Sequence, residues 1–242
     1  MKRAFPILAA LTALLLAYAF YEAMWIAPME RTMGDVQRIF YYHVPSAWTA
    51  FLLFTVNLVA SVVYLIRRNA KADAVAVVSA EVGVVFCTIV LVTGPIWARP
   101  VWGIWWTWDV RLTTTLVLWL IYVSYLMLRR FSDSSQTPKL AAVLAIFGAL
   151  DVPLVYFSIW FFRTQHPQPV IGGGGSIDPR MLHVLLINWL AFSCFAFLVC
   201  WARYQIEMLQ REVQEALALE SLLGDVSPTV RLDKTSSKAG RA

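Results

Sequence analysis

Charged residues are scarce in this sequence. Only 14% of its 242 residues are Asp, Glu, Lys or Arg, whereas 60% are hydrophobic and the mean hydropathy is +0.64. Soluble domains average about one quarter charged and about one half apolar residues. The composition therefore excludes an ordinary soluble domain and predicts a membrane protein.

Cysteine is scarce as well. Cys87, Cys194 and Cys200 are odd in number, lie in apolar stretches, and form neither a C-x-x-C nor a C-x-x-C-H pattern. The sequence thus lacks the spacing of a zinc site, a dithiol redox pair or a covalent haem attachment. We interpret the three as small apolar packing residues.

Long apolar runs, in contrast, are plentiful and predict six transmembrane helices. About 20 apolar residues are needed to cross about 30 Å of hydrocarbon. The predicted spans are Phe5–Ile26, Ala47–Ile66, Ala74–Ile96, Thr113–Leu128, Leu140–Phe162 and Met181–Trp201. The first run contains an Ala17-Tyr18-Ala19 stretch typical of a signal-peptidase site. It is longer than the core of about 7 to 15 residues in a secretory signal, so we expect this helix to be retained.

The distribution of Lys and Arg predicts that both termini are cytoplasmic. Fourteen of these residues lie on the side of the N-terminus, eight beside the spans and six in the tail after Trp201, against six on the other side. Those six are Arg31, Arg38, Arg99, Arg111, Arg163 and Arg180. The segments around Met29–Ser46, Trp97–Leu112 and Arg163–Arg180 are then on the outer face.

The chain is predicted to be an all-α integral membrane protein with a short tail. Residues 1–202 form the six-helix membrane domain, with an outer loop at 97–112. Residues 203–223 carry apolar side chains at helical spacing, which predicts a cytoplasmic amphipathic helix. These side chains are Ile206, Leu209, Val213 and Leu217. Residues 224–242 are small and polar, and we expect them to be disordered.

The first outer segment, RTMGDVQRIFYYHVPSAW, has the pattern of a short amphipathic helix lying in the membrane interface. Met33, Val36, Phe40 and His43 recur at helical spacing, with charged residues on another face. Pro45 suits the first turn of the following span. His43 is therefore predicted to end this helix and to face the membrane or the bundle.

The three histidines all fall on the outer side. His183 lies in DPRMLHVLLINW, about one turn into the sixth span, and His166 lies among prolines in RTQHPQPV. Taken alone, either His43 or His183 is equally well explained as a satisfied structural residue. With a Trp-rich loop between them in sequence, the two together favour a binding site. We interpret His166 as a solvated loop residue.

Tryptophan is concentrated in the stretch WGIWWTWDVRLT, which begins at Trp102. Five of the eleven tryptophans lie within twelve residues: Trp97, Trp102, Trp105, Trp106 and Trp108. An interfacial belt accounts for one or two rings at a helix end, so this density predicts a ligand. Indoles offer broad rigid faces, which suit a large, flat, apolar molecule.

Charge and metal chemistry narrow the choice of ligand. Arg99 and Arg111 flank the loop and suit a molecule with carboxylates, which guanidinium groups bind in a bidentate manner. The two histidines suit a metal that accepts two imidazoles. Haem combines a planar macrocycle, two propionates and an iron with axial positions for histidine.

The same stretch resembles the WWD signature of the haem-handling membrane proteins of cytochrome c assembly. With YYHVPSAW, six spans and its short length, the chain is similar over Phe5–Trp201 to the family of haem exporter protein C (CcmC). That family belongs to the cytochrome c maturation (Ccm, system I) pathway. The glycine run Gly172–Gly175 in the third outer segment has no match in this resemblance, and we expect it to be a flexible tether.

The resemblance implies that haem b is presented on the periplasmic face of a bacterial inner membrane. It implies that His43 and His183 are the axial ligands of the iron, and that the WWD loop forms a platform against the porphyrin. The platform residues are Trp102, Trp105, Trp106, Trp108 and Asp109.

The resemblance also implies a transfer function without bond-making chemistry, so we expect no enzymatic activity in this chain. Haem would pass to the membrane-anchored chaperone CcmE, which binds it covalently. The ABC transporter subunits CcmA and CcmB and the single-helix protein CcmD would be further partners.

The acidic residues are ambiguous. Asp109 either contacts the ligand directly or has a structural role. In that role it accepts hydrogen bonds that order the loop, pairs with Arg111, or caps the following helix, because WDVRLT leads straight into the fourth span. Glu81 and Asp151 lie within spans, where ionisable groups are costly and usually functional or paired. We interpret both as structural, with a helix kink at Asp151-Val152-Pro153.

Two other functions remain open on the sequence. One is a b-type cytochrome for electron transfer, although such proteins usually place histidine pairs deep in the bundle. The other is a permease whose tryptophans gate a small substrate. A haem reducible by quinol would favour the first, and substrate flux in vesicles would favour the second.

Overall fold

The computed structural model describes residues 4–132, 134–162, 164–169 and 177–239, with side chains described as far as Leu223. All named elements in these ranges are helices. They are α1 (Ala4–Tyr21), a π-helix η1 (Glu22–Ile26), a 3-10 helix η2 (Asp35–Ile39), α2 (Phe40–Arg67), α3 (Ala70–Trp102), α4 (Val110–Phe131), α5 (Thr137–Ala149), α6 (Asp151–Phe161) and α7 (Pro179–Ala239). The predicted Gly172–Gly175 tether lies outside the described residues.

Six stretches of helix are long and apolar enough to cross a membrane, which confirms the six predicted spans. They are Ala4–Ile26, Asp35–Arg67, Ala70–Trp102, Val110–Phe131, Thr137–Phe161 and Pro179–Leu223. The all-α class is confirmed with them. The cytoplasmic location of the termini stays a prediction.

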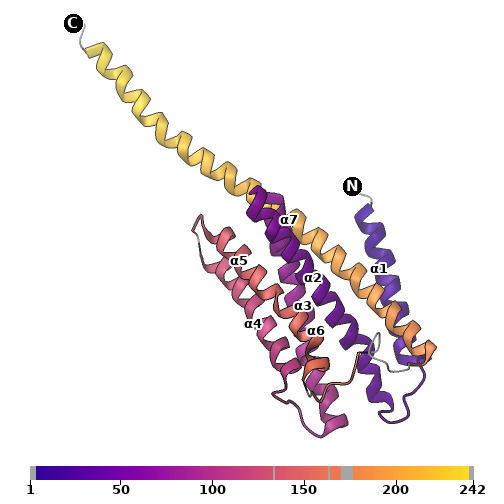
Figure 1. Ribbon diagram of the computed structural model, residues 1–242. Coiled ribbons are helices and arrows are strands. Elements are labelled where there is room, and N and C mark those ends of the chain that lie inside the picture. The colour runs from indigo at the N-terminus through magenta and orange to yellow at the C-terminus, as the bar shows by residue number, and fades with distance from the viewer. Residues whose placement is uncertain (1–3, 133, 163, 170–176, 240–242) are drawn as a thin grey trace. The chain divides into compact units, whose positions relative to one another are not determined.

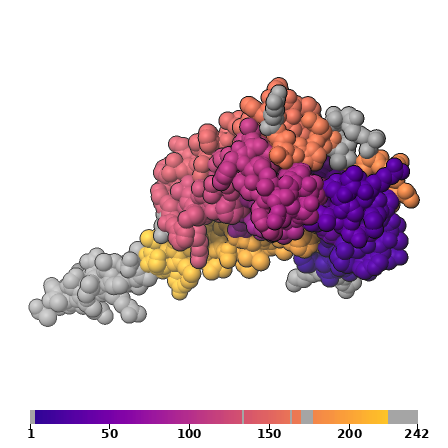
Figure 2. All heavy atoms as spheres, turned by 90° about the horizontal axis from the view of Figure 1, so that it is seen from below, coloured from indigo at the N-terminus to yellow at the C-terminus, as the bar shows by residue number. Residues whose placement is uncertain are grey.

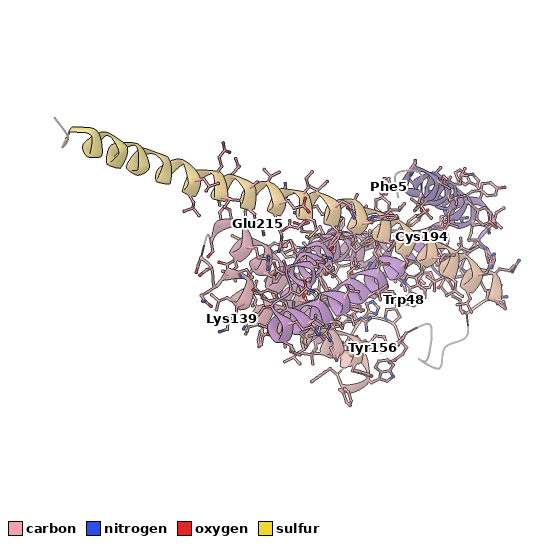
Figure 3. All side chains as sticks on the ribbon, turned by 90° about the horizontal axis from the view of Figure 1, so that it is seen from above. Phe5, Trp48, Lys139, Tyr156, Cys194 and Glu215 are labelled. Atoms are coloured by element: carbon pink, nitrogen blue, oxygen red, sulfur yellow. The ribbon has the colours of Figure 1, made fainter. Side chains whose placement is uncertain are left out.

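The chain divides into two compact units, Met1–Trp201 and Ala202–Ala242. In the first unit, α2 and α3 pack along each other, α4 packs against α3, α5 packs against α2, and α6 packs against α4 and α5 (Figure 1). Helix α1 and the first part of α7 cover another side. In Figure 3, Phe5 and Cys194 mark that side, Lys139 and Tyr156 mark the side of α5 and α6, and Trp48 of α2 lies between.

Close helix packing depends on two glycines. Phe54 of α2 stacks on Tyr122 of α4 with ring centroids 3.8 Å apart. A Cβ on Gly83 of α3 would lie only 2.7 Å from the Phe54 ring, and a Cβ on Gly148 of α5 would lie 2.7 Å from Ile121. These glycines allow the helices to approach closely in the core.

The first outer segment differs from its prediction. Instead of a separate interfacial helix, Asp35–Ile39 forms one 3-10 helix that runs directly into α2. Arg38 fixes it by donating to the carbonyl of Ala23 at 2.7 Å. Pro45 stays within the first turns of α2, so no break separates the two segments. His43 therefore lies in the first turn of α2 instead of ending a helix of its own.

The fifth span is divided, as the Asp151-Val152-Pro153 stretch predicts. Helix α5 ends at Ala149 and α6 begins at Asp151, with Leu150 between them. Proline removes one backbone donor and disfavours a helical conformation in the residue before it. Both α5 and α6 pack against α4.

The second unit continues helix α7 beyond Trp201. Two ion pairs between residues four apart lie in its first turns: Glu207 accepts from Arg203 at 3.1 Å and from Arg211 at 2.8 Å. The apolar side chains of its predicted face are exposed: Ile206, Leu209, Val213 and Leu217. The tail 224–242 has no described side chains, and its disorder stays a prediction.

Candidate functional site

A cavity opens at the end of the first unit where α2 and α4 begin and α3 ends. It measures about 1130 Å³ when the space at its mouth is counted, and α2, α3, α4 and α6 form its walls. Its inner part is apolar and is lined by Ala47, Ala50, Phe51, Val90, Leu91 and Val155. Mostly apolar walls with a few polar groups are typical of a small-molecule or cofactor site.

His43 projects into this cavity from the first turn of α2. It is 7% exposed, and its Nδ1 lies 2.8 Å from the hydroxyl of Thr93 on α3. That hydroxyl donates its only hydrogen to the carbonyl of Ile89 at 2.7 Å. The imidazole Nδ1 must then be the donor to Thr93, which leaves Nε2 with a free lone pair.

His166 lies beside His43, contrary to its interpretation as a solvated loop residue. The two ring centroids are 6.5 Å apart with planes inclined by 31°. His166 Nδ1 lies 2.9 Å from the carbonyl of Pro167, which can only accept, so here too Nδ1 donates and Nε2 keeps its lone pair. Burial and the nearby Arg111 guanidinium lower the pKa of His166 to about 4, which keeps the ring neutral.

Three of the five clustered tryptophans line the cavity. Trp97 meets His43 edge-on at 5.8 Å, and Trp102 and Trp106 complete this wall. The indole nitrogens of Trp97 and Trp106 are buried and have no hydrogen-bond partner among the described residues. Trp105 and Trp108 do not line the cavity and are 58% and 76% exposed. The tryptophan cluster is thus divided between a cavity wall and an exposed surface.

The two arginines next to the loop play different parts. Arg111, in the first turn of α4, lines the cavity, and its Nη1 is buried without a hydrogen-bond partner in the described part of the chain. Arg99 is absent from the lining and donates to the carbonyl of Gly103. Gly103 ends α3 in the left-handed region, with φ of 78°, where glycine is favoured. Arg99 therefore stabilises the end of α3.

Asp109 is the N-cap of α4, which is one of the structural roles predicted for it. Its Oδ1 accepts from the Leu112 backbone N–H at 3.0 Å. Its Oδ2 accepts from the Thr107 hydroxyl at 3.0 Å and from the Gln165 backbone N–H at 3.3 Å. In Figure 2 the magenta part of the chain adjoins the orange part on this face of the molecule. Asp109 hydrogen-bonds the segment after α3 to the segment after α6.

His183 is not brought to this cavity. It lies on an exposed part of α7, whose neighbours Met181, Val184 and Leu185 pack against Phe40 and Tyr41. The structure thus gathers His43, Trp102, Trp106 and Arg111 of the predicted site residues. It leaves His183, Trp105, Trp108, Asp109 and Arg99 off the cavity lining.

Sequence reasoning missed three residues that line the cavity: His166, Trp97 as a wall residue, and Gly94. A Cβ on Gly94 would lie 3.4 Å from Cε1 of His43, so the glycine leaves space beside the imidazole. The signal for His166 was present in the sequence, because it is the histidine of the third outer segment. Its proline neighbours suggested a solvated loop instead.

Comparison with known proteins gives a consistent result. The family model for heme exporter protein C (CcmC) matches residues 1–219. The chain is 36% identical over 222 residues to heme exporter protein C of Bradyrhizobium diazoefficiens, covering 90% of this chain and 84% of the relative. It is 33% identical over 195 residues to heme exporter protein C of Escherichia coli K12, covering 80% and 77%. A putative cytochrome c biosynthesis ccmC-like mitochondrial protein of Marchantia polymorpha is 34% identical over 185 residues, covering 76% and 78%.

Proposed function

The chain belongs to the family of heme exporter protein C, and we propose that it holds haem b between His43 and His166 and releases it to the chaperone CcmE. Its family supports a role in haem export for cytochrome c biogenesis and identifies it as a haem-handling membrane component. The ligand pair and the acceptor are the parts that we add.

The pair of imidazoles carries the proposal. A metal–imidazole bond is about 2 Å long, so two axial imidazoles on one metal place their ring centres about 6 Å apart. The centroids of His43 and His166 are separated by 6.5 Å. Each ring has Nδ1 engaged in a hydrogen bond and Nε2 free. A ligating histidine almost always has its second nitrogen fixed in this way.

The remaining walls match the other parts of haem. The apolar inner wall and the faces of Trp97, Trp102 and Trp106 suit the macrocycle. Arg111 supplies a guanidinium whose Nη1 is buried without a hydrogen-bond partner in the described residues, which suits a propionate carboxylate. The haem iron brings four equatorial nitrogens of its own, so two protein ligands complete its coordination.

Release is the second half of the function. The chain makes and breaks no covalent bond; it binds haem, orients it and leaves one edge reachable from the mouth of the cavity. Trp105 and Trp108 are exposed on the same loop that lines the cavity, and they form the surface on which CcmE docks. CcmA, CcmB and CcmD complete the assembly, and the site faces the periplasm from the bacterial inner membrane.

The sequence resemblance favours a different second ligand, His183, and one experiment decides between the two. Visible spectra of the detergent-purified protein, oxidised and dithionite-reduced, are recorded for wild type and for the H43A, H166A and H183A variants after addition of hemin. We expect six-coordinate low-spin haem in wild type and H183A, and its loss in H43A and H166A. If H183A loses the low-spin haem and H166A retains it, the ligand pair is His43 and His183 instead.

The handoff is tested separately. W105A/W108A should keep wild-type haem content, because neither ring lines the cavity, while the yield of haem-loaded CcmE falls at least tenfold. W102A/W106A is the matched control, since it removes the same number of rings from the cavity wall and should lower haem content itself. Undiminished loaded CcmE in W105A/W108A would refute the docking role.

A further inference from the structure

Asp109 lies at the junction of the two segments that build the site, and its two carboxylate oxygens have separate tasks. Oδ1 caps α4 through the Leu112 N–H, while Oδ2 faces Thr107 and the backbone of Gln165. Capping needs only one acceptor oxygen. The second oxygen is therefore available to hold the neighbouring segment.

The residue held by Oδ2 immediately precedes His166. Gln165 belongs to a short segment without helical or strand hydrogen bonds, and such a segment needs other contacts to fix a side chain accurately. Two more contacts act locally: the Thr164 hydroxyl donates to the His166 carbonyl at 3.3 Å, and His166 Nδ1 donates to Pro167. The contact with Asp109 differs because it ties the segment to a membrane-spanning helix.

We infer that Asp109 is a positioning residue, which fixes the His166 imidazole opposite His43 by anchoring Gln165 to the N-terminus of α4. Arg111 lies two residues further along the same helix and lines the cavity. One helix end thus sets the place of both the guanidinium and the imidazole. This inference rests on the proposed role of His166 and assigns to Asp109 no contact with haem.

The variant D109N separates the two tasks. Asparagine is as good an N-cap as aspartate, so α4 keeps its start. The amide offers one acceptor oxygen, so Leu112 and Gln165 cannot both be satisfied, and an amide N–H faces one of these two backbone donors. T107V is the matched control, because it removes one hydrogen bond to the same oxygen and leaves the Gln165 contact in place.

Haem release and haem spectra are measured together. In D109N we expect release of haem to apomyoglobin about tenfold faster than in wild type, the size of one lost charge-assisted hydrogen bond. We also expect part of the haem to become five-coordinate and high-spin, and added imidazole to restore the low-spin spectrum. T107V should remain within about twofold of wild type in release rate.

The outcomes are distinguishable. If H166A loses low-spin haem and D109N has a wild-type spectrum and release rate, Asp109 does not position His166 and only the inference fails. If H166A itself keeps a wild-type spectrum, the proposed ligand pair fails and the inference fails with it. If D109N and the equally good cap D109S both fail to accumulate in membranes, Asp109 serves the fold of α4 and the positioning role is wrong.

Discussion

Helix α4 has Arg111 in its first turn and Arg129 and Arg130 in its last turn, and the surroundings of Arg111 and Arg129 differ sharply. Arg129, in the last turn, forms a bidentate pair with Asp73 of α3, with nitrogen–oxygen distances of 2.8 and 2.6 Å. Arg111, in the first turn, has a buried Nη1 without a hydrogen-bond partner in the described residues and borders the cavity. A buried guanidinium costs free energy unless it is paired. The contrast fits a structural role for Arg129 and supports the proposal that Arg111 binds a carboxylate of haem.

The largest effect on stability should follow from breaking the ion pair between Arg129 and Asp73. In D73A the Arg129 guanidinium loses its carboxylate in a site where Asp73 is 3% exposed. Removing one partner of a buried pair costs about 3–5 kcal/mol. We expect a much lower melting temperature in detergent and low abundance, with a normal haem spectrum in the protein that remains.

The double variant D73L/R129L is the control for this prediction. It removes both charges and replaces them with apolar side chains, which is often neutral for stability. It should recover most of the melting temperature lost in D73A. If D73A is as stable as wild type, the pair does not support the bundle and the contrast between the two arginines disappears.

R111A should show the reverse pattern. The variant removes a guanidinium whose Nη1 is buried without a hydrogen-bond partner in the described part of the chain, so the melting temperature of the haem-free protein should stay the same or rise. Hydrogen bonds to charged groups contribute about 1.5–3 kcal/mol, so haem affinity should fall about 10- to 100-fold. R111K keeps the charge without the bidentate fork, so its haem affinity should lie between those of wild type and R111A. Wild-type affinity in R111A would exclude its role in binding a carboxylate.

The sequence could predict the fold to a greater extent than the site. Apolar runs identify spans because the bilayer requires about 20 apolar residues for each crossing, and this rule held for all six. The pairing of His43 with His166 depends on how α2 and the segment after α6 meet, and no local pattern in RTQHPQPV encodes that contact. His183 was favoured because it is also near the outer end of a span. The position of His183 along the span does not determine which face of α7 this residue occupies.

The same distinction explains the tryptophans. Their density in WGIWWTWDVRLT predicts a ligand beside this loop, and three of the five rings line the cavity. Whether a given ring faces the cavity or the surroundings depends on where α3 ends. Helix α3 extends to Trp102 and stops at Gly103. The predicted third span, in contrast, ends at Ile96, and the predicted loop begins at Trp97. Trp97 was thus assigned to a loop although it belongs to a helix wall.

A smaller effect is expected from filling the space next to His43. G94A should bind haem within about threefold of wild type, because its Cβ would stand 3.4 Å from Cε1 of His43, an ordinary contact. G94V adds two methyl groups, and overpacking typically costs about 1–3 kcal/mol. We expect haem binding weakened about 5- to 100-fold in G94V, measured by hemin titration. Equal binding in G94V and G94A would show that haem does not approach this wall.

The smallest effect concerns pH and tests whether His166 is shielded from water. Its pKa of about 4 lies below the ordinary value of about 6.5, because burial and Arg111 both disfavour the charged ring. The unfolded chain then binds more protons than the folded one between these two values. The contribution of this group to stability is therefore complete above about pH 6.5 and declines as the pH falls toward 4.

Iron ligation needs the neutral imidazole, so hemin uptake by the haem-free protein should be the same at pH 7 and pH 5 and should fall near pH 4. In R111A the nearby positive charge is gone, and the fall should move to higher pH. A midpoint near pH 6.5 in wild type would mean that His166 is solvated, as its proline-rich surroundings first suggested, and would leave His43 without the neighbour on which the site depends.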